Sequence, residues 1–525
     1  MREENKPKYP GGHWKRWIPA AILVLLVFVA YGPAMRAGYI WDDDLLLTDN
    51  PNLTLPGGLQ KIWFSGENVQ YYPMVFTSFY IEKKLWGNDP AGYHAVNIFL
   101  HGLNAVLIGL ILKRLKMKNA WLAAAIFAFH PVHVESTAWI SERKNLLSGF
   151  FYLSSLGAYL KYDEGEGRRW YGTSLLLFTA ALLSKTVTST LPAVILLLNW
   201  MKNGSLDSRT FRRMVPYFCM GVGMGLITIQ FENKGGAMGT GWIFSSAERF
   251  LIAGRALWFY LGKLVWPADL IFIYPRWNID AGDFTQYLFP LTFMALSAIL
   301  WIFRRLIGRE PLTAALFFAG TLFPALGFFN LYPMRFSFVA DHFQYLASIG
   351  PIAAFAWLMN RSSERSVTYG RISSCALILV LAGLTWRQSG NYRDLETLWR
   401  VTLTKNPECW MAHDNLANLL VKKGKTGEAE SHYREAIHLK PDYEEARNNL
   451  GAILLGKGKY SEAETQFRAV IQIRPDYAKA HNNLGAVLYR QGNEQGAVTC
   501  FKNALRLNPE LKDAQDNLNA ALGVP

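Results

Sequence analysis

The chain has 525 residues, of which 51% are hydrophobic and only 18% are charged. Globular proteins carry about 25% charged residues, and the apolar residues of this chain are concentrated in long runs before residue 386. The composition therefore excludes a single soluble domain, a disordered chain and a fibrous protein. Four cysteines lie far apart without a paired spacing, so the sequence indicates neither a disulfide framework nor a thiolate metal site.

The formal charge of +14 raises the question of a nucleic-acid partner, and the distribution of that charge argues against one. Six hydrophilic segments hold 22 Lys and Arg against 8 Asp and Glu, whereas residues 388–525 hold 18 against 17 and the remaining residues hold 14 against 15. The excess lies on alternate loops of a membrane domain, which is the pattern that places basic loops in the cytosol. The six segments are 1–17, 113–118, 161–170, 202–213, 304–310 and 361–371.

Eleven apolar stretches are long enough to cross about 30 Å of hydrocarbon, and they predict an all-α membrane domain over residues 1–386. The first stretch could instead be a secretory signal, because Lys15 and Arg16 precede it, but the run continues through Tyr31 and no small-residue cleavage site follows. The stretches lie near residues 17–35, 94–112, 120–133, 146–160, 171–184, 187–201, 214–230, 286–303, 312–329, 343–359 and 372–386.

If the basic segments lie in the cytosol, the N-terminus is cytosolic and residues 387–525 lie outside the cytosol. Outer loop 1 then covers residues 36–93. Residues 248–266 are apolar enough to cross as well, but a twelfth crossing would move the arginines at 304, 305 and 309 outside. Because cationic residues are spread along this segment, we expect an amphipathic helix at the outer interface. The other outer segments are 134–145, 231–285 and 330–342.

The sequence after Trp386 is soluble in composition and repeats with a period of 34 residues. This step separates Pro407, Pro441, Pro475 and Pro509, and it also separates three glycines and three alanines. A 34-residue helix-turn-helix unit is typical of tetratricopeptide repeats. We expect a linker helix over 387–407 and, over 408–525, three repeats at 408–441, 442–475 and 476–509 with a capping helix.

An asparagine recurs at the same place in each predicted repeat, at Asn415, Asn449 and Asn483. The first helix of a repeat usually lines the concave face, where a row of amides could bind the backbone of a peptide through both donors and acceptors. The alternative is a local structural role. The sequence leaves both open.

Outer loop 1 begins with Asp42, Asp43 and Asp44, which directly follow the first membrane helix. Adjacent carboxylates repel one another, so burial near a bilayer requires a cation, a proton or a hydrogen-bonded acceptor. The alternative is a solvated turn. The aspartates could hold Mg²⁺ or Mn²⁺, and the sequence leaves any cofactor unknown.

Other polar residues recur near the same membrane edge. His94, Asn97, His101 and Asn104 share one face of the second predicted membrane helix, where they either line a substrate-facing cavity or hydrogen bond between helices. Clustered His and Glu in the next outer loop could suggest zinc, but no HExxH motif or Cys pair supports it, so we expect a pocket rim. That loop contains His130, His133, Glu135, Glu142, Arg143 and Lys144.

Lys185 interrupts an apolar run near the outer end of the fifth predicted membrane helix. A lysine at this depth either extends its amine to the interface or pairs with an anion, and a lipid phosphate is an available anion.

The order of these motifs resembles one family, the transmembrane and tetratricopeptide repeat-containing proteins and their bacterial relatives. The resemblance is carried by GYIWDDDLLLTDNP, YYPMVFTSFYIEKKLWG, GYHAVNIFLHGLN, FAFHPVHVESTAWISERKNLLSG, LLSKTVTSTLP and ADHFQYLASIG, followed by the repeats. It implies the membrane fold of the GT-C glycosyltransferases with about eleven crossings, and the transfer of a sugar, such as mannose, from a polyprenyl phosphate to a protein hydroxyl. It also implies a place in the bacterial inner membrane, with the repeats in the periplasm.

The resemblance also implies site residues. Asp42 and Asp43 match an acidic pair used as base and acceptor-binding group, Lys185 matches a lysine that binds the donor phosphate, and Arg143 with Lys144 matches a basic pair. Relatives commonly carry Arg where this chain has His342, which weakens the case for a permanent charge there. Arg255 and Arg335 are further candidates for the phosphate, and Asp341 and His342 for the pocket lining. Several GT-C enzymes resemble this chain without needing a metal.

Two other functions remain open. One is a membrane-tethered scaffold whose repeats recruit envelope proteins, although eleven crossings with polar groups on one side exceed what an anchor requires. The other is a transporter, although charge near the bilayer midplane is scarce and no inverted repeat is visible.

Overall fold

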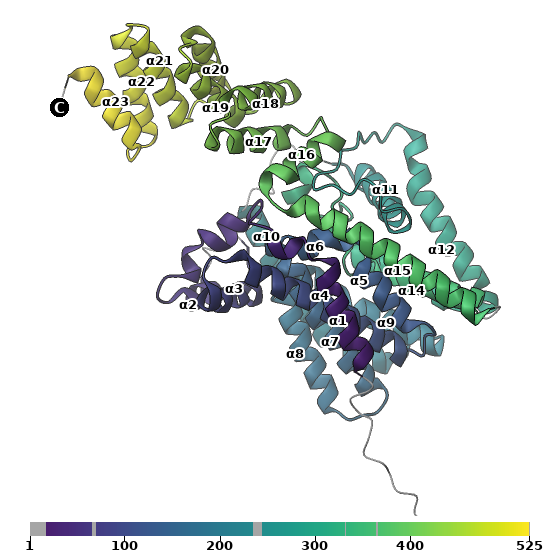
Figure 1. The fold of residues 1–525 in the computed structure, drawn as a ribbon. Coiled ribbons are helices and arrows are strands. Elements are labelled where there is room, and N and C mark those ends of the chain that lie inside the picture. The colour runs from purple at the N-terminus through teal and green to yellow at the C-terminus, as the bar shows by residue number, and fades with distance from the viewer. Residues whose placement is uncertain (1–16, 66–69, 235–243, 331, 364–365, 524–525) are drawn as a thin grey trace, which may run out of the picture. The chain divides into compact units, whose positions relative to one another are not determined.

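The computed structural model describes residues 17–65, 70–234, 244–330, 332–363 and 366–523, and across these ranges it contains helices and no strand (Figure 1). This confirms the predicted all-α class. The chain divides into two compact units, Met1–Asp394 and Leu395–Pro525. The boundary falls inside the segment 387–407, for which the sequence predicted a linker helix.

The N-terminal unit contains α1 to α15, joined by loops, short 3-10 turns and a π-helical turn at Asp44–Thr48. In chain order, the helices are α1 (Ile18–Ala30), α2 (Gly58–Phe64), α3 (Pro73–Trp86), α4 (Pro90–Arg114), α5 (Ala120–Phe129), α6 (Val134–Ala138), α7 (Arg143–Asp163), α8 (Arg169–Leu182), α9 (Leu191–Asn203), α10 (Ser208–Lys234), α11 (Ser246–Val265), α12 (Leu288–Ile307), α13 (Glu310–Leu322), α14 (Ile349–Ser363) and α15 (Val367–Ser389).

Four helical segments within the described ranges are long and apolar enough to cross a membrane, at Pro90–Arg114, Ser208–Phe231, Phe284–Ile307 and Val367–Tyr392. Each of the eleven apolar stretches in the sequence falls largely on a helix of this unit. The number of crossings remains a prediction, because several of these helices are short.

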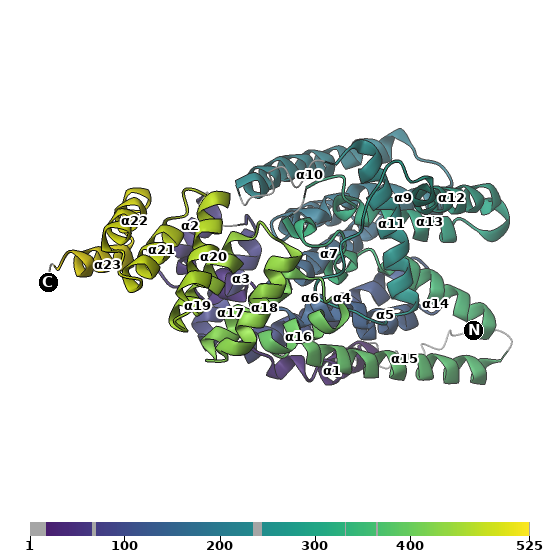
Figure 2. The same ribbon diagram turned by 90° about the horizontal axis from the view of Figure 1, so that it is seen from above.

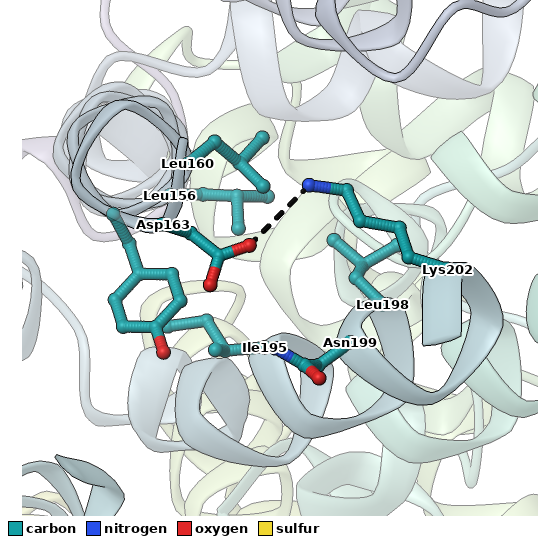
Figure 3. Close-up of a pocket in the computed structure, with 8 residues that line it drawn as sticks. Leu156, Leu160, Asp163, Ile195, Leu198, Asn199 and Lys202 are labelled. Carbon is teal, nitrogen blue, oxygen red and sulfur yellow. Dashed lines mark ion pairs between the residues drawn. The ribbon is translucent and has the colours of Figure 1, made fainter. Parts of the chain in front are cut away.

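Helix α4 lies at the centre of the N-terminal unit and packs against α1, α5 and α7 (Figures 1 and 2). Its neighbour α7 has 21 residues, which corresponds to about 30 Å at 1.5 Å per residue, so the two ends of α7 lie far apart. At the far end, a narrow apolar hollow separates α7 from α9, and Lys202 Nζ lies 3.5 Å from Asp163 Oδ2 (Figure 3). The candidate acidic and basic residues lie at the other end of α7.

The segment 248–266, expected to be amphipathic, falls on α11, which begins with a capping box between Ser245 and Glu248. One face of the helix is buried against α12, and its cations contact loops and rings. Arg249 donates to the Gly327 carbonyl at 2.7 Å, and Lys263 donates to the Ala268 carbonyl at 2.7 Å. The interfacial position of α11 remains a prediction.

The C-terminal unit consists of paired antiparallel helices that repeat every 34 residues. The turn within each pair contains Gly424, Gly458 or Gly492, and all three have a positive φ of 73° to 84°, which glycine adopts without a Cβ penalty. The helices are α16 (Leu395–Lys405), α17 (Trp410–Lys422), α18 (Thr426–Leu439), α19 (Glu444–Gly456), α20 (Tyr460–Ile473), α21 (Ala478–Arg490), α22 (Glu494–Leu507) and α23 (Lys512–Leu522).

Helix α16 packs against α17. Its charged residues stand at the same positions as those in the second helix of a repeat. Glu396 pairs with Lys423 and Glu430 pairs with Lys457, and both partners are 27 residues further on. Arg400 pairs with Glu428 at 2.7 Å, as Arg434 pairs with Glu462 at 2.9 Å. The array therefore begins with half a repeat before residue 408.

Candidate active site

Asp42 lies between α1 and α2, in a turn that the backbone holds in an unusual conformation. Trp41 has a φ of 51°, which is rare for a bulky residue, and such strain recurs at functional sites. The Oδ1 atom of Asp42 is buried and accepts no hydrogen bond from the described residues. Burial raises the pKa of Asp42 to about 6, with Lys144 opposing the shift and Glu142 adding to it. A carboxylate in this state can accept a proton near neutral pH.

Asp43, in contrast, is fully occupied by protein donors. Its Oδ2 accepts from the Ile40 amide at 2.9 Å, and its Oδ1 accepts from the Ser141 amide at 2.8 Å and the Ser141 hydroxyl at 2.5 Å. Burial and the charge of Asp42 raise the pKa of Asp43, while these donors lower it. Asp43 therefore connects the segment 36–93 to the turn before α7 and fixes the direction of its neighbour Asp42.

Two lysines pair with one carboxylate, Glu142, and one of them, Lys144, also acts on Asp42. Glu142 Oε1 lies 2.9 Å from Lys144 Nζ, and its Oε2 lies 3.5 Å from Lys185 Nζ. Asn145 accepts from Lys185 Nζ at 2.8 Å and donates to Glu142 Oε2 at 2.5 Å. We call Glu142, Lys144, Asn145 and Lys185 the cationic cluster.

The charges of this cluster depend on one another. Although burial disfavours its charge, Glu142 has a pKa lowered to about 2 by His342, Lys144 and Lys185. Burial lowers the pKa of Lys185 to about 8, against the opposing effect of Glu142. With one carboxylate between two ammonium groups, the cluster keeps a net positive charge that an incoming anion can use.

Arg143 is adjacent to Lys144 but points elsewhere. Its side chain is 0% exposed, pairs with Glu82 of α3 and donates to Asn97 of α4. Further donations go to the Ser78 hydroxyl at 3.3 Å and to the Tyr93 carbonyl at 3.0 Å. These contacts use all of its N–H groups, so the structure places Arg143 in a structural role outside the cationic cluster.

The residues predicted around position 341 form a second buried group. His342 Nδ1 lies 2.9 Å from Glu135 Oε1, and the Tyr274 hydroxyl donates to Asp341 Oδ1 at 2.9 Å. Asn145 Nδ2 donates to the His342 carbonyl at 2.9 Å. The structure therefore brings Glu135 and His342 next to the cationic cluster, while their place in a pocket lining remains a prediction.

The other predicted pocket histidines lie in the packed interior. His101 contacts the Tyr345 hydroxyl at 2.9 Å, His130 contacts the Leu264 carbonyl at 3.0 Å, and His133 contacts the Phe127 carbonyl at 2.8 Å. For His101, the contact favours the alternative of hydrogen bonding between helices over a substrate-facing cavity, while the pocket rim expected at His130 and His133 remains a prediction. His94 is fully buried as well, and neither of its ring nitrogens has a hydrogen-bond partner within the described ranges.

The two remaining basic candidates lie in other parts of the N-terminal unit. The Arg255 guanidinium lies over the Trp277 ring at 4.6 Å, and Arg335 is exposed at the end of a 3-10 turn, Tyr332–Arg335. The contact of Arg255 does not involve the cationic cluster.

The acidic turn does not fit a divalent cation. Mg²⁺ and Mn²⁺ prefer several converging oxygen ligands, but Asp43 is already occupied by three donors. Within the described part of the chain, no three His, Cys, Asp or Glu residues are grouped to hold a metal ion. We therefore derive no step through a metal.

The predicted row of asparagines exists, but its amides are used between repeats. Asn449 Nδ2 donates to Asn418 Oδ1 at 3.0 Å, and Asn483 Nδ2 donates to Asn448 Oδ1 at 3.0 Å. Asn415 Nδ2 donates to the Met411 carbonyl within its own helix. These bonds favour the structural alternative, while each side chain remains partly exposed.

Three residues at the site carried no signal that sequence reasoning used. Ser141 binds Asp43, Asn145 bridges the cationic cluster, and the Trp139 ring lies 5.4 Å from Lys144 Nζ and 5.9 Å from the His342 ring. The spacing of Glu142 and Asn145, three apart at the start of a helix, could have indicated a shared face.

Comparisons with known proteins agree with both parts of the sequence interpretation. The TPR repeat model matches residues 417–458 and 453–492, and the Tetratricopeptide repeat model matches residues 478–511. The C-terminal unit is a tetratricopeptide-repeat array. Among solved structures, the Arabidopsis OM64 TPR domain gives a TM-score of 0.21 at 23% identity, covering 22% of this chain and 94% of that domain.

The curated relatives share one name. Protein O-mannosyl-transferase F38B6.6 of Caenorhabditis elegans is 26% identical over 440 residues, covering 78% of this chain and 61% of that protein. Protein O-mannosyl-transferase TMTC1 of Homo sapiens is 26% identical over 494 residues, covering 79% of this chain and 54% of that protein. The predicted resemblance to this family is confirmed. The chain spans little more than half the length of these relatives.

Proposed function

We propose that this chain is a membrane glycosyltransferase of the GT-C type. It moves a sugar, mannose or a similar one, from a polyprenyl phosphate to a protein or peptide hydroxyl on the extracytoplasmic side of the bacterial inner membrane. The observation that carries the proposal is the buried, unpartnered Oδ1 of Asp42 close to the charges of Lys144 and Glu142. The names of the relatives support the class of reaction.

The proposed reaction is a single displacement with inversion at the anomeric carbon. The acceptor oxygen bonds to that carbon, the bond to the phosphate oxygen breaks, and Asp42 takes the proton of the acceptor hydroxyl. Asp43, fixed by Ser141, positions Asp42 or the acceptor. Lys185 and Lys144 stabilise the leaving phosphate as its charge grows.

The proposed class of reaction can be tested directly. Purified protein is incubated with a panel of labelled polyprenyl-phosphate sugars and a polypeptide acceptor, and transfer and hydrolysis are both measured. Transfer from one member of the panel supports the proposal. Binding of envelope proteins to the repeats, without transfer or hydrolysis of any member, would instead favour the scaffold, which the repeat array makes the second candidate.

The proposed orientation predicts the outcome of reporter fusions. A reporter that is active only in the periplasm should be active when fused after residue 525 and silent when fused at Arg114, because Arg114 lies in a basic segment. Reporter activity on cells expressing each fusion is the measurement. The reverse pattern would contradict the assignment of every outer loop.

The repeat array provides a separate prediction about the acceptor. Replacing Asn415, Asn449 and Asn483 together by Ala should weaken the use of a polypeptide acceptor but leave slow donor hydrolysis intact. Loss of the bonds to Asn418 and Asn448 should also cost about 1 kcal/mol of stability each.

The matched control is Asn517→Ala, because Asn517 Nδ2 makes the same kind of bond to Asn482 at 2.9 Å but lies outside the three-residue row. Acceptor kinetics and thermal unfolding are measured for each variant. If donor hydrolysis disappears in the triple variant, the asparagines support the catalytic unit and the peptide-groove proposal is wrong.

A further inference from the structure

The repeat array contains a cavity of about 240 Å³ that is lined by residues of α18, α19 and α20. Its apolar floor consists of Ile437, Leu450 and Leu454. The volume exceeds the volume of about 150 Å³ that accepts a benzene ring, and it is smaller than the pockets of about 300 to 1,000 Å³ that take drug-sized ligands. One ring-sized apolar group and one small polar group therefore fit. The polar residues of the wall are Arg434, Arg447, Glu462, Thr465 and Gln466.

The cavity lies on a different side of α19 from the asparagine row. Successive residues of a helix are about 100° apart, so Arg447, Leu450 and Leu454 share one side of α19, whereas Asn448 and Asn449 lie on the other side. The cavity is therefore separate from the row that contains Asn449. A ligand in the cavity and a peptide on the asparagines would not compete for the same groups.

Arg447 occupies a position at which the neighbouring repeats have histidine. Its Nε donates to the Pro441 carbonyl at 2.8 Å. One repeat earlier and one repeat later, His413 and His481 donate through Nε2 to the equivalent proline carbonyls, each at 2.9 Å. The side chain at this position therefore has a shared structural role. Arginine fulfils that role through Nε alone, so its two Nη groups are additional to what the fold requires.

These Nη groups carry a positive charge that no carboxylate neutralises within the described part of the chain. Nη1 of Arg447 donates to Gln466 Oε1 at 3.0 Å, and Nη2 has no partner there. Glu462, the carboxylate of the cavity wall, pairs with Arg434 at 2.9 Å instead. Because a guanidinium only donates, Gln466 presents its oxygen to Arg447, and its amide nitrogen has no partner in the same ranges. Both side chains are partly exposed, so a ligand can reach them from solvent.

We propose that this cavity binds a small organic carboxylate whose apolar part is about the size of one ring. The apolar part packs on the floor, and the carboxylate accepts from Arg447 and Gln466. A planar guanidinium suits a carboxylate because two of its N–H groups donate in parallel. One unpaired positive charge matches a monoanion, whereas a phosphate ester carries up to two negative charges near neutral pH. Arginine stays charged throughout the working pH range, so the proposed site does not depend on the titration of a protein group.

The experiment measures binding of phenylacetate to the full-length protein in detergent by saturation-transfer NMR, with titrations that give the affinity. Phenylacetamide has the same ring without the charge, and acetate has the charge without the ring. A hydrogen bond to a charged group is worth about tenfold to a hundredfold in affinity, so phenylacetamide should bind more weakly than phenylacetate by that factor. Acetate should bind at least about tenfold more weakly, because it buries no ring. Phenyl phosphate should bind no more tightly than phenylacetate.

Arg447→His tests the role of the charge in a variant that should fold, because histidine holds this position in both neighbouring repeats. At pH 8 an imidazole with an ordinary pKa of about 6.5 is mostly neutral. The variant should therefore bind phenylacetate about tenfold to a hundredfold more weakly and bind phenylacetamide as the parent does. His481→Gln changes the equivalent position of the next repeat and is the matched control, which should leave binding unchanged. Thr465→Trp places a ring at the exposed wall of the cavity and should abolish binding of both probes.

Several outcomes would overturn the proposal. It is wrong if the parent does not bind phenylacetate, if phenylacetate and phenylacetamide bind equally, or if Arg447→His binds phenylacetate as tightly as the parent does. Binding that persists in Thr465→Trp would place the probe elsewhere, and tighter binding of phenyl phosphate would contradict the carboxylate class. Should Arg447→His fail to fold, the comparison of the probes and Thr465→Trp still decide. Sugar transfer by the same protein is measured separately, so failure of this proposal leaves the proposed function untouched.

Discussion

Replacing Asp42 by Asn should lower the turnover of sugar transfer by about 10²- to 10⁴-fold, while donor binding remains nearly unchanged. The amide keeps the shape and much of the hydrogen bonding of the carboxylate but cannot accept a proton. Lys185→Ala should behave differently and mainly weaken donor binding, because Lys185 belongs to the cationic cluster. Single-turnover transfer and separate donor binding distinguish the two effects.

The same prediction includes a definite dependence of sugar transfer on pH. A base acts when it is deprotonated, so transfer should fall as the pH drops through about 6, the value to which burial raises the pKa of Asp42. The raised pKa also means that the ionised form is the less stable one in the folded protein, so Asp42 lowers stability as the pH rises from about 4 to about 6. Asp42→Asn should therefore be at least as stable as the parent at neutral pH. An inactive but stable variant excludes misfolding as the cause.

The acidic turn supplies its own controls. Asp44 is exposed and lies two residues away, so Asp44→Asn should have a mild effect. Asp43→Asn should lower both stability and transfer, since Asp43 holds the Ser141 amide and hydroxyl. If Asp42→Asn and Asp43→Asn both keep normal transfer where the parent is active, the acidic turn has a structural role only and the proposed site is wrong.

Much of the fold could be predicted from local patterns. The 34-residue period identified the repeat array, because glycine, alanine and proline recur where the turn and the helix contacts require them. The sequence did not predict the half repeat at α16, because the spacing that α16 shares with the repeats is carried by surface charges such as Glu396 and Arg400 instead of small residues. The apolar runs predicted the positions of the long helices for the same local reason, namely length and hydrophobicity.

The site was harder to predict because contacts between distant residues define it. Arg143 and Lys144 are neighbours in the sequence, but a helix directs adjacent side chains about 100° apart, so one meets Glu82 and the other meets Glu142. Nothing local to position 143 indicates that Glu82, 61 residues earlier, is its partner. The asparagine row shows the same limit, because a spacing of 34 places amides in line but does not say whether they bind each other or a ligand.

Removing the charge of Arg143 should destabilise the protein by about 3 to 5 kcal/mol, because it leaves Glu82 as an unpaired buried carboxylate. Glu82 is only 5% exposed, and Arg143 Nη2 donates to its Oε2 at 3.1 Å, so this pair connects α3, in the segment 36–93, to α7. Thermal unfolding of Arg143→Met in detergent is the measurement, together with limited proteolysis of the 36–93 loop. The loop should become more sensitive to the protease.

Two further variants separate this structural role from a role in catalysis. The double variant Glu82→Leu with Arg143→Met should recover much of the lost stability, because it removes both charges and leaves apolar groups in their place. Lys144→Met, at the next position of α7, should lose less stability, since Glu142 keeps Lys185 as a partner, but it should weaken donor binding more than Arg143→Met does. Arg143→Met could instead fold as stably as the parent and lose donor affinity. In that case Arg143 binds the donor phosphate, and the assignment of a structural role to Arg143 and a catalytic role to Lys144 is wrong.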